Sequence, residues 1–345
     1  MVEVNQQEII YGSMQRSVIN LSITSEITRI KTNISNAYTE LKNKNATIPS
    51  VENSEGLASS IASIQTGGGE PITKGIIINE CDSDGYATDV SIVGMTKIPN
   101  YYFYYAAATP TSSTYAWMSK VGNNLHLPNN LTEIGDSAFY QCPGIAIDKL
   151  PDSVTIIDKY AFYGCSNLAL TSLPENLVRI NERAFYNAIN LPLKSLPKKL
   201  GIIDTYAFYG CSYNLDFEEI PDNVAIINSH AFYACVNLKL KSVSRNVTTL
   251  SYYTFYNCRA ITELTCKGNL TSIGTYVFYN CSNLTKLILP NITSVPQLQG
   301  TNAFTGTPIA SGTGYIYVPD NLVASFQSAS NWSTYASQIK GVSEL

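Results

Sequence analysis

Charged side chains are scarce in this sequence. Asp, Glu, Lys and Arg make up 14% of its 345 residues, and the formal net charge at pH 7 is −4. This balance excludes the strongly basic surface that attracts nucleic acid or an anionic membrane, so we expect no nucleic-acid partner. Polarity comes instead from Ser, Thr, Asn and 24 tyrosines.

Long apolar runs and targeting signals are also absent. No run approaches the roughly 18 apolar residues that a membrane-spanning helix needs, so we expect no membrane insertion. The first eight residues contain neither the basic segment nor the apolar core of a secretory signal.

Motifs that carry chemistry are missing as well. The sequence shows no glycine-rich phosphate loop, zinc-ligand spacing or paired-carboxylate motif. Its two histidines, His126 and His230, are joined by no pattern to a nucleophile or a metal. We therefore expect no catalytic residues, no metal and no cofactor, and we predict that the protein is not an enzyme.

One phrase, Ala-Phe-Tyr-x-Cys, returns through the middle of the chain. Its phenylalanines follow one another at intervals of 23 or 24 residues: Phe139, Phe162, Phe185, Phe208, Phe232, Phe255 and Phe278. Such a period indicates a solenoid, in which each turn is stable because the next turn covers its apolar face. We predict a mainly β fold, a solenoid of about 23-residue repeats with seven to eight rungs.

Six of the eight cysteines occupy one repeat position, three residues after the phenylalanine: Cys142, Cys165, Cys211, Cys235, Cys258 and Cys281. Equivalent positions of a solenoid lie above one another, and Ala188 fills the rung without cysteine, as a small buried packing site allows. We expect free buried thiols; the alternative is a bridged or metal-bound subset. Reduced thiols favour folding in a cytosol.

Each repeat contains two apolar stretches before its Ala-Phe-Tyr corner. The first stretch, as in Leu168–Pro174 and Leu191–Pro197, has the Leu-x-Leu spacing of a strand with one inward face, and proline ends it. The second, as in Val154–Ile157, is shorter.

The segment before the repeats, residues 1–66, contains a heptad series of apolar residues. Isoleucine at both core positions of a heptad favours more than two strands, so we predict a helical coiled-coil anchor that forms a homotrimer. A single amphipathic helix packed on a neighbouring element is the alternative. The predicted oligomerisation residues are Ile23, Ile27, Ile30, Ile34, Ala37 and Leu41.

The remaining chain divides into four parts. Residues 67–74 form a glycine-rich linker, 75–130 an N-terminal β cap with a degenerate first repeat, 131–310 the regular repeats, and 311–345 a small C-terminal αβ cap with one strand and two short helices. In the β cap, Asp82–Gly85 partly matches a calcium loop, and we interpret it as a hairpin turn because the other ligand positions are absent.

The repeat unit resembles a known family. Leu-Pro-x-x-Leu-Thr-x-Ile-Gly-x-x-Ala-Phe-Tyr-x-Cys-x-x-Leu, as at 127–145 and 270–284, is similar to the BspA-like class of leucine-rich repeats, over about residues 95–310. The resemblance implies a right-handed β-rich solenoid used for surface recognition, with no catalytic residues. Residues 34–61 resemble N-terminal segments of tail proteins from phages of Gram-positive hosts.

Positions that vary from rung to rung are the candidate binding surface. One line precedes the Ala-Phe pair and is expected to face outward, and a second group lies at outward strand positions. A second line of tyrosines, directly after each phenylalanine, is interpreted as corner packing. The binding candidates are Tyr160, Arg183, Tyr206, His230, Tyr253, Tyr276, Lys194, Glu218, Lys239 and Lys241.

From these features we predict a phage tail-fibre or receptor-binding protein, made in the host cytoplasm and located in the virion tail. Its partners would be other copies of itself, other tail or baseplate proteins, and a host surface glycan or protein. The alternatives are a bacterial BspA-like surface adhesin and a purely structural virion component. The missing secretory signal favours the tail protein over the adhesin, because an adhesin must leave the cell.

Overall fold

The computed structural model describes residues 75–345 except 83–85 and 105–117. The chain divides into two units between Pro71 and Ile72, and the described residues all belong to the second unit. The predicted coiled coil, with Ile23, Ile27, Ile30, Ile34, Ala37 and Leu41, lies outside the described residues. Most of the turn at Asp82–Gly85 also lies outside them.

The described part begins with the predicted hairpin. Strands β1 (Gly75–Cys81) and β2 (Ala87–Val93) pair in antiparallel register, with Gly75 opposite Val93. Strand β4 (Leu125–His126) then pairs with β2 in parallel. Val90 and Ile92 of β2 are buried in the same core as the repeats, so the hairpin covers the first rung.

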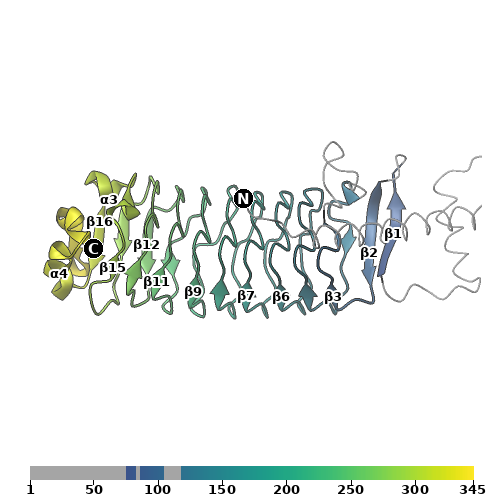
Figure 1. Ribbon diagram of the computed structural model, residues 1–345, viewed down its shortest axis with the longest axis horizontal. Coiled ribbons are helices and arrows are strands. Elements are labelled where there is room, and N and C mark those ends of the chain that lie inside the picture. Colours follow the sequence, from purple (N-terminus) through teal and green to yellow (C-terminus); the bar gives the residue numbers. More distant parts are fainter. Residues whose placement is uncertain (1–74, 83–85, 105–117) are drawn as a thin grey trace, which may run out of the picture. The chain divides into compact units, whose positions relative to one another are not determined.

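Short parallel strands connect the first six rungs. Each has two residues, and its second residue is buried while its first is exposed or partly so. Each strand pairs with the strand of the next rung, as Ile157 does with Ile180, and Figure 1 shows several of them side by side. In order, they are β3 (Lys97–Ile98), β5 (Glu133–Ile134), β6 (Ile156–Ile157), β7 (Arg179–Ile180), β8 (Ile202–Ile203) and β9 (Ile226–Ile227).

The later rungs carry two parallel sheets. Both join equivalent stretches of successive repeats in parallel register. The three-stranded sheet contains β11 (Thr249–Leu250), β13 (Ser272–Ile273) and β15 (Gln297–Leu298). The five-stranded sheet contains β10 (Ser242–Val243), β12 (Glu263–Cys266), β14 (Lys286–Ile288), β16 (Tyr315–Val318) and β17 (Ile339–Gly341).

The first apolar stretch of the early rungs is not a strand, contrary to the sequence prediction. Leu168 and Leu170 are buried as expected, but Thr171 and Ser172 are both exposed before Leu173 turns inward again. Two exposed residues in succession break the period-2 alternation of a strand. Where alternation holds, as at Leu264 and Cys266 of β12, the stretch becomes a strand.

A column of phenylalanine rings fills the core. From Phe103 to Phe304 each ring stacks on that of the next rung, with centroids 5.0 to 5.8 Å apart. Beside it, each ladder cysteine donates its S–H to a phenylalanine carbonyl of the preceding rung, as Cys235 does to Phe208 at 3.1 Å. The corresponding distances for the other five thiols are 2.9 to 3.0 Å.

These thiols are free and buried, as predicted. Burial raises the pKa of Cys281 to about 12, so the thiols remain protonated donors. Cys266, outside the ladder, is also buried, whereas Cys81 is exposed. The repeated cysteine is therefore a packing residue that also satisfies a backbone carbonyl.

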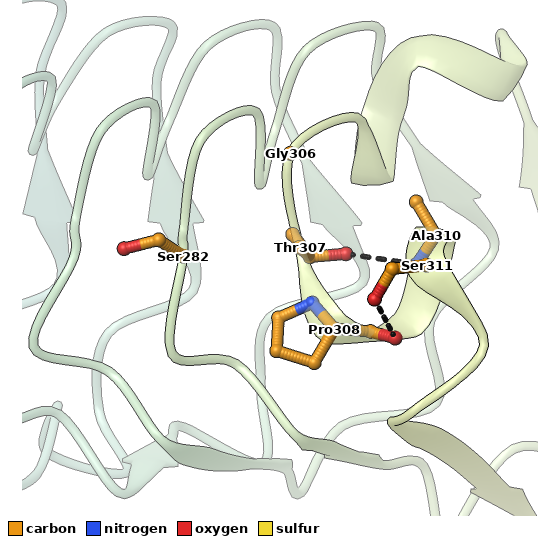
Figure 2. A pocket seen from close by; sticks show the side chains of 6 residues that line it. All are labelled: Ser282, Gly306, Thr307, Pro308, Ala310 and Ser311. Carbon is orange, nitrogen blue, oxygen red and sulfur yellow. Dashed lines mark hydrogen bonds between the residues drawn. The ribbon is translucent and has the colours of Figure 1, made fainter.

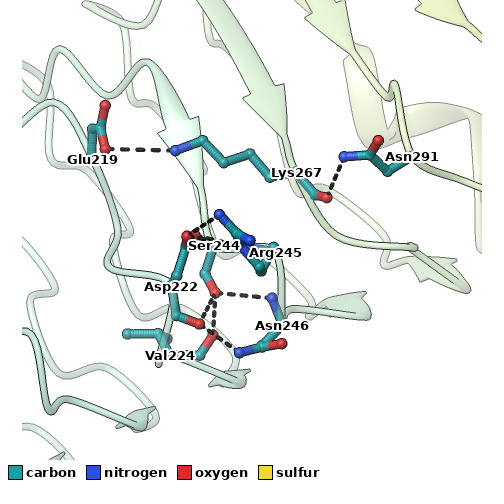
Figure 3. A network of polar contacts seen from close by, with 8 residues as sticks. All are labelled: Glu219, Asp222, Val224, Ser244, Arg245, Asn246, Lys267 and Asn291. Carbon is teal, nitrogen blue, oxygen red and sulfur yellow. Dashed lines mark hydrogen bonds and ion pairs between the residues drawn. The ribbon is translucent and has the colours of Figure 1, made fainter.

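Polar side chains also join successive rungs at the turn before the short strands β9 and β11. The buried Ser244 hydroxyl donates to the Val224 carbonyl at 2.6 Å, and the Arg245 guanidinium pairs with Asp222 at 2.7 Å. Asn246 Nδ2 donates to the Asp222 carbonyl at 2.6 Å (Figure 3). Because each of these contacts joins one rung to the preceding rung, the network holds successive rungs in register.

The C-terminal segment covers the last phenylalanine. Trp332 Nε1 donates to the Pro296 carbonyl at 2.7 Å, and the Tyr335 ring lies 5.2 Å from that of Phe304. The first predicted helix is present as a 3₁₀ turn and α4, but the second is a 3₁₀ helix that leads into strand β17. The elements are η2 (Thr301–Phe304), α3 (Pro308–Ser311), η3 (Asp320–Leu322), α4 (Val323–Ser328), η4 (Trp332–Gln338) and η5 (Val342–Glu344).

Candidate recognition surface

The Ala-Phe-Tyr corner of each rung is bonded to the next corner by its backbone. In the rung of Phe162, three N–H groups donate to carbonyls of the following rung: Tyr160 to Glu182 at 3.0 Å, Phe162 to Ala184 at 2.8 Å and Gly164 to Tyr186 at 2.7 Å. The neighbouring rungs repeat this pattern. Side chains at equivalent corner positions are therefore held one strand spacing apart.

We call the first of two outer rows the variable column. Its members precede the Ala-Phe pair and include all six variable corner residues that the sequence analysis selected. The sequence predicted that these side chains face solvent. In the structure they stack in register, and each is partly buried between its neighbours. The variable column consists of Tyr160, Arg183, Tyr206, His230, Tyr253 and Tyr276.

Stacking along the variable column is continuous. The Arg183 guanidinium carbon lies 4.5 Å from the centroid of the Tyr206 ring, and Arg183 Nη1 donates to the Tyr160 hydroxyl at 2.7 Å. The His230 ring lies between those of Tyr206 and Tyr253, at 4.5 and 4.6 Å. Tyr253 and Tyr276 follow at 4.8 Å. His230 is thus one member of a continuous stack of side chains.

Every member of the variable column has a left-handed backbone. The φ angles run from 54° at Arg183 to 61° at Tyr276. Residues with a Cβ pay about 1–2 kcal/mol for this conformation, which glycine adopts without strain. Contacts along the column must offset that cost at each rung. No local residue type indicates this strain, because no member is glycine or asparagine.

The second row, which we call the tyrosine column, directly follows the phenylalanines. Neighbouring rings lie 4.4 to 4.9 Å apart and within 14° of parallel. The rings are partly buried, in agreement with their interpretation as corner packing. The column consists of Tyr104, Tyr140, Tyr163, Tyr186, Tyr209, Tyr233, Tyr256 and Tyr279.

The two columns lie side by side and are almost uncharged. Rings of the same rung, such as Tyr253 and Tyr256, are 5.7 Å apart and tilted by 48°. Burial, together with the neighbouring Tyr209 and Tyr163, raises the pKa of Tyr186 to about 12. Burial, with a smaller effect of Arg183, lowers the pKa of His230. Near neutral pH, Arg183 is therefore the main charge, and it pairs with Glu182.

Ring stacking decides what this surface can offer a ligand. Because most ring faces contact another ring, the columns present ring edges and phenol hydroxyls outward. This arrangement combines apolar contact with hydrogen bonding on side chains that lose little entropy on binding. It is suited to recognition, and it contains no nucleophile paired with a base.

The four other predicted binding residues lie on a different stretch of the rung. Lys194, Glu218, Lys239 and Lys241 are all exposed. Lys241 pairs with Glu218 of the preceding rung at 2.7 Å. The structure places these residues on the stretch that follows the aromatic corner, so they form a second exposed group rather than part of the columns.

One exposed apolar group was not predicted from the sequence. The outward residues Ile156, Val178 and Ile226 are 42%, 55% and 45% exposed, on or beside strands β6, β7 and β9. The sequence does contain a pattern that indicates this group, because aliphatic residues occupy outward positions in neighbouring repeats. The pattern is hard to recognise, because inward isoleucines lie on the same strands.

A shallow hollow lies near the C-terminal end of the repeats. Its volume is about 470 Å³, and Figure 2 shows the small residues that line it: Ser282, Gly306, Thr307, Pro308, Ala310 and Ser311. Within the described ranges, no group of three His, Cys, Asp or Glu residues is placed to hold a metal ion. Over the same residues, no helix has the length and apolarity to cross a membrane.

Three solved structures are similar to this chain, each with a low TM-score. A leucine-rich repeat protein from Bacteroides ovatus matches with 21% identity and a TM-score of 0.39, covering 70% of this chain and 69% of its own. A leucine-rich cell surface protein from Faecalibacterium prausnitzii matches with 16% identity and a TM-score of 0.30, covering 78% and 97%. A T. pallidum leucine-rich repeat protein matches with 22% identity and a TM-score of 0.33, covering 59% and 90%.

Comparison with curated protein sequences gave no match. A family model does match: the BspA type leucine-rich repeat region aligns in six copies to residues 96–214 and 212–328. The matched ranges contain every residue of both aromatic columns, and they cover more than half of the chain. The chain therefore belongs to the BspA-type leucine-rich repeat family.

Proposed function

We propose that this protein is a non-enzymatic recognition protein of the adhesin type. Its repeats would form one continuous solenoid, and the aromatic columns would bind a surface glycan or protein of a target cell. The variable column carries this proposal. Six successive rungs hold large side chains at left-handed positions, and backbone strain of this kind is concentrated at functional sites.

The variation along the column supports recognition over packing alone. Packing would be met by tyrosine at every rung, as in the tyrosine column, yet Arg183 and His230 interrupt the series. Arginine and tyrosine are also the residues enriched where proteins make their strongest contacts. The exposed group of Lys194, Glu218, Lys239 and Lys241 would contribute at the edge of the contact.

Two settings fit this function. Membership of the BspA-type family supports a bacterial cell surface. A phage tail fibre is the second candidate, supported by the heptad series in residues 1–66 and by the resemblance of residues 34–61 to phage tail proteins. In that setting the partners would be two further copies and other tail or baseplate proteins.

A binding assay with full-length protein tests the proposal. Labelled protein would be applied to intact bacterial and epithelial cells and to a printed glycan array. We expect the triple variant Tyr206→Ser/His230→Ser/Tyr253→Ser to bind about tenfold less than the wild type or worse. A matched control, Tyr213→Ser/Tyr252→Ser, removes tyrosines that are 58% and 48% exposed outside the columns and should bind normally. Equal binding by both variants would contradict the proposal.

The oligomeric state of the full-length protein is tested in a separate measurement. Light scattering should give a trimer for the full-length protein and a monomer for Ile27→Asp/Ile34→Asp, because charge at heptad core positions opposes helix association. A monomeric wild type would remove the support for the tail-fibre setting. It would leave the adhesin proposal intact.

A further inference from the structure

Both aromatic columns end one rung before the repeat pattern does. Thr305 occupies the tyrosine-column position of the next rung: Asn280 N–H donates to the Thr305 carbonyl at 2.8 Å, as Asn257 N–H donates to that of Tyr279 at 2.8 Å. Asn302 likewise takes the position that follows Tyr276 in the variable column. The backbone continues, but the ring is missing.

Tyr279 therefore differs from the other members of the tyrosine column. From Tyr140 to Tyr256, each ring is stacked on both faces. Among the aromatic rings of the described residues, that of Tyr279 pairs only with the ring of Tyr256, at 4.9 Å and 1°, and with the ring of Tyr276 in its own rung, at 5.6 Å and 60°.

The second face of Tyr279 looks toward an open position. Thr305 and Gly306 are both exposed, and neither carries a ring that could stack on Tyr279. Neighbouring strands lie about 4.7 Å apart, which is the spacing at which a ligand ring would stack on Tyr279. This is a place on the surface where an aromatic face, rather than an edge, is offered.

The surroundings of this face are small, polar and uncharged. Gly306 has a φ of 77°, and a Cβ there would lie 2.4 Å from Asn280 Oδ1, so no side chain can rise beside Thr305. The hollow of Figure 2 begins at Gly306, and none of its lining residues is charged. The exposed Ser282 hydroxyl has no hydrogen-bond partner within the described chain.

These features together fit a sugar ring. The C–H groups on the apolar side of a pyranose carry partial positive charge, which the negative face of an aromatic ring attracts. The hydroxyls around the sugar need donors and acceptors, and Ser282, Thr305 and Asn280 supply them nearby. A charged ligand would find no countercharge among the residues that line the hollow.

We propose that the open face of Tyr279 binds one pyranose ring of a glycan, in the place that a tyrosine at position 305 would fill. The rest of the glycan would extend over the hollow lined by Ser282 and Ser311. The inference rests on the proposed function and deepens it, because it assigns the ligand class and a subsite at the end of the column.

Ligand-observed saturation-transfer NMR on the full-length protein tests this subsite. The probes are methyl β-D-glucopyranoside, methyl β-D-galactopyranoside and methyl N-acetyl-β-D-glucosaminide, with 4-methylphenol as a mimic of a protein tyrosine. We expect transfer to the ring protons of at least one pyranoside. Tyr279→Ala should reduce it about tenfold, since the stacking face is lost.

Thr305→Tyr is the decisive variant. The backbone at Thr305, φ −56° and ψ 132°, accepts tyrosine without strain, and the new ring should stack on Tyr279 and occupy the sugar position. We expect sugar binding to fall about tenfold while the melting temperature stays equal or rises. Thr248→Tyr adds a ring at an exposed position elsewhere and should leave binding unchanged.

Three results would overturn the subsite: no saturation transfer to any pyranoside, undiminished transfer in Thr305→Tyr, or binding of 4-methylphenol alone. The last would point to a protein side chain as the ligand. The proposed function fails separately, if the variable-column triple variant still binds cells. If that variant loses cell binding and the wild type binds no pyranoside, the proposed recognition function stands and only the Tyr279 subsite is excluded.

Discussion

The inner and outer columns come from adjacent residues of one repeated phrase, and they obey different constraints. The phenylalanine rings are buried, with centroids 5.0 to 5.8 Å apart, whereas the tyrosine rings beside them are closer, at 4.4 to 4.9 Å, and only partly buried. The inner rings also fill volume against leucines and cysteines, so their identity is fixed by packing. The outer rings contact mainly each other.

The difference shows how one repeat can build both a core and a display surface. Because the repeats are equivalent, every corner residue has a stacking partner in a neighbouring rung, whether the residue faces the core or the solvent. An inner residue must also match its lateral neighbours. An outer residue need not, which is why Arg183 and His230 are accepted in the variable column.

Truncation of an inner ring should have the largest effect. Phe208→Ala leaves a cavity in the core and should lower the free energy of unfolding by about 3–5 kcal/mol. Tyr209→Ala, its neighbour in the outer column, should cost about 1–2 kcal/mol because it loses two stacking contacts. Urea denaturation followed by circular dichroism measures both. Equal losses would show that the two columns are not distinct.

The cysteine ladder should give an intermediate effect. Cys235→Ala removes a buried S–H···O contact to the Phe208 carbonyl and leaves a small void, for a loss of about 1–2 kcal/mol. Ala188→Cys restores the missing thiol and should add about 0.5–1 kcal/mol by donating to the Phe162 carbonyl. Chemical denaturation checks the pair. A destabilised Ala188→Cys would mean that this rung lacks room for sulfur.

Changes in the variable column should separate stability from binding. In Tyr206→Asn, the loss of stacking is partly offset by the tolerance of asparagine for the left-handed backbone, so the free energy of unfolding should change by less than about 1 kcal/mol. Cell binding should fall severalfold. A large stability loss without a change in binding would make this column a packing element like its inner neighbour.

The smallest effect concerns pH. His230 has a pKa below its ordinary value of 6.5 in the folded state, so the unfolded chain takes up the proton first. Its neutral form stabilises the fold above pH 6.5, and this contribution is lost as pH falls through the lowered pKa. The melting temperature of His230→Tyr should therefore decline less between pH 7.5 and 5 than that of the wild type. Identical declines would contradict the buried environment of the imidazole.

Much of the repeat architecture was readable from the sequence. The interval between phenylalanines predicted the stacked rungs, and the shared position of six cysteines predicted a buried ladder. The antiparallel pairing of β1 with β2 followed from the turn residues Asp82–Gly85 and the flanking apolar runs. These inferences worked because an inward position repeats its residue type in every rung, which makes periodicity visible without coordinates.

Other features depended on contacts that the sequence does not encode locally. The left-handed backbone at Tyr160 or Arg183 is imposed by hydrogen bonds to the next rung, against the local preference of those residues. Whether a first stretch such as Leu168–Pro174 becomes a strand depends on where consecutive exposed residues fall. The partial burial of His230 depends on rings one rung above and below it.

The period, the buried residue types and the family can all be inferred from the amino-acid sequence, because all three follow from one phrase repeated at a constant interval. The stacking of the variable residues into a column, and the lack of a stacked ring on one face of Tyr279, become visible in the three-dimensional structure of the described residues. The physical reason is that both properties belong to the relation between rungs. Each arises from backbone hydrogen bonds between residues about 23 positions apart, which fix side chains relative to neighbours that no local pattern identifies.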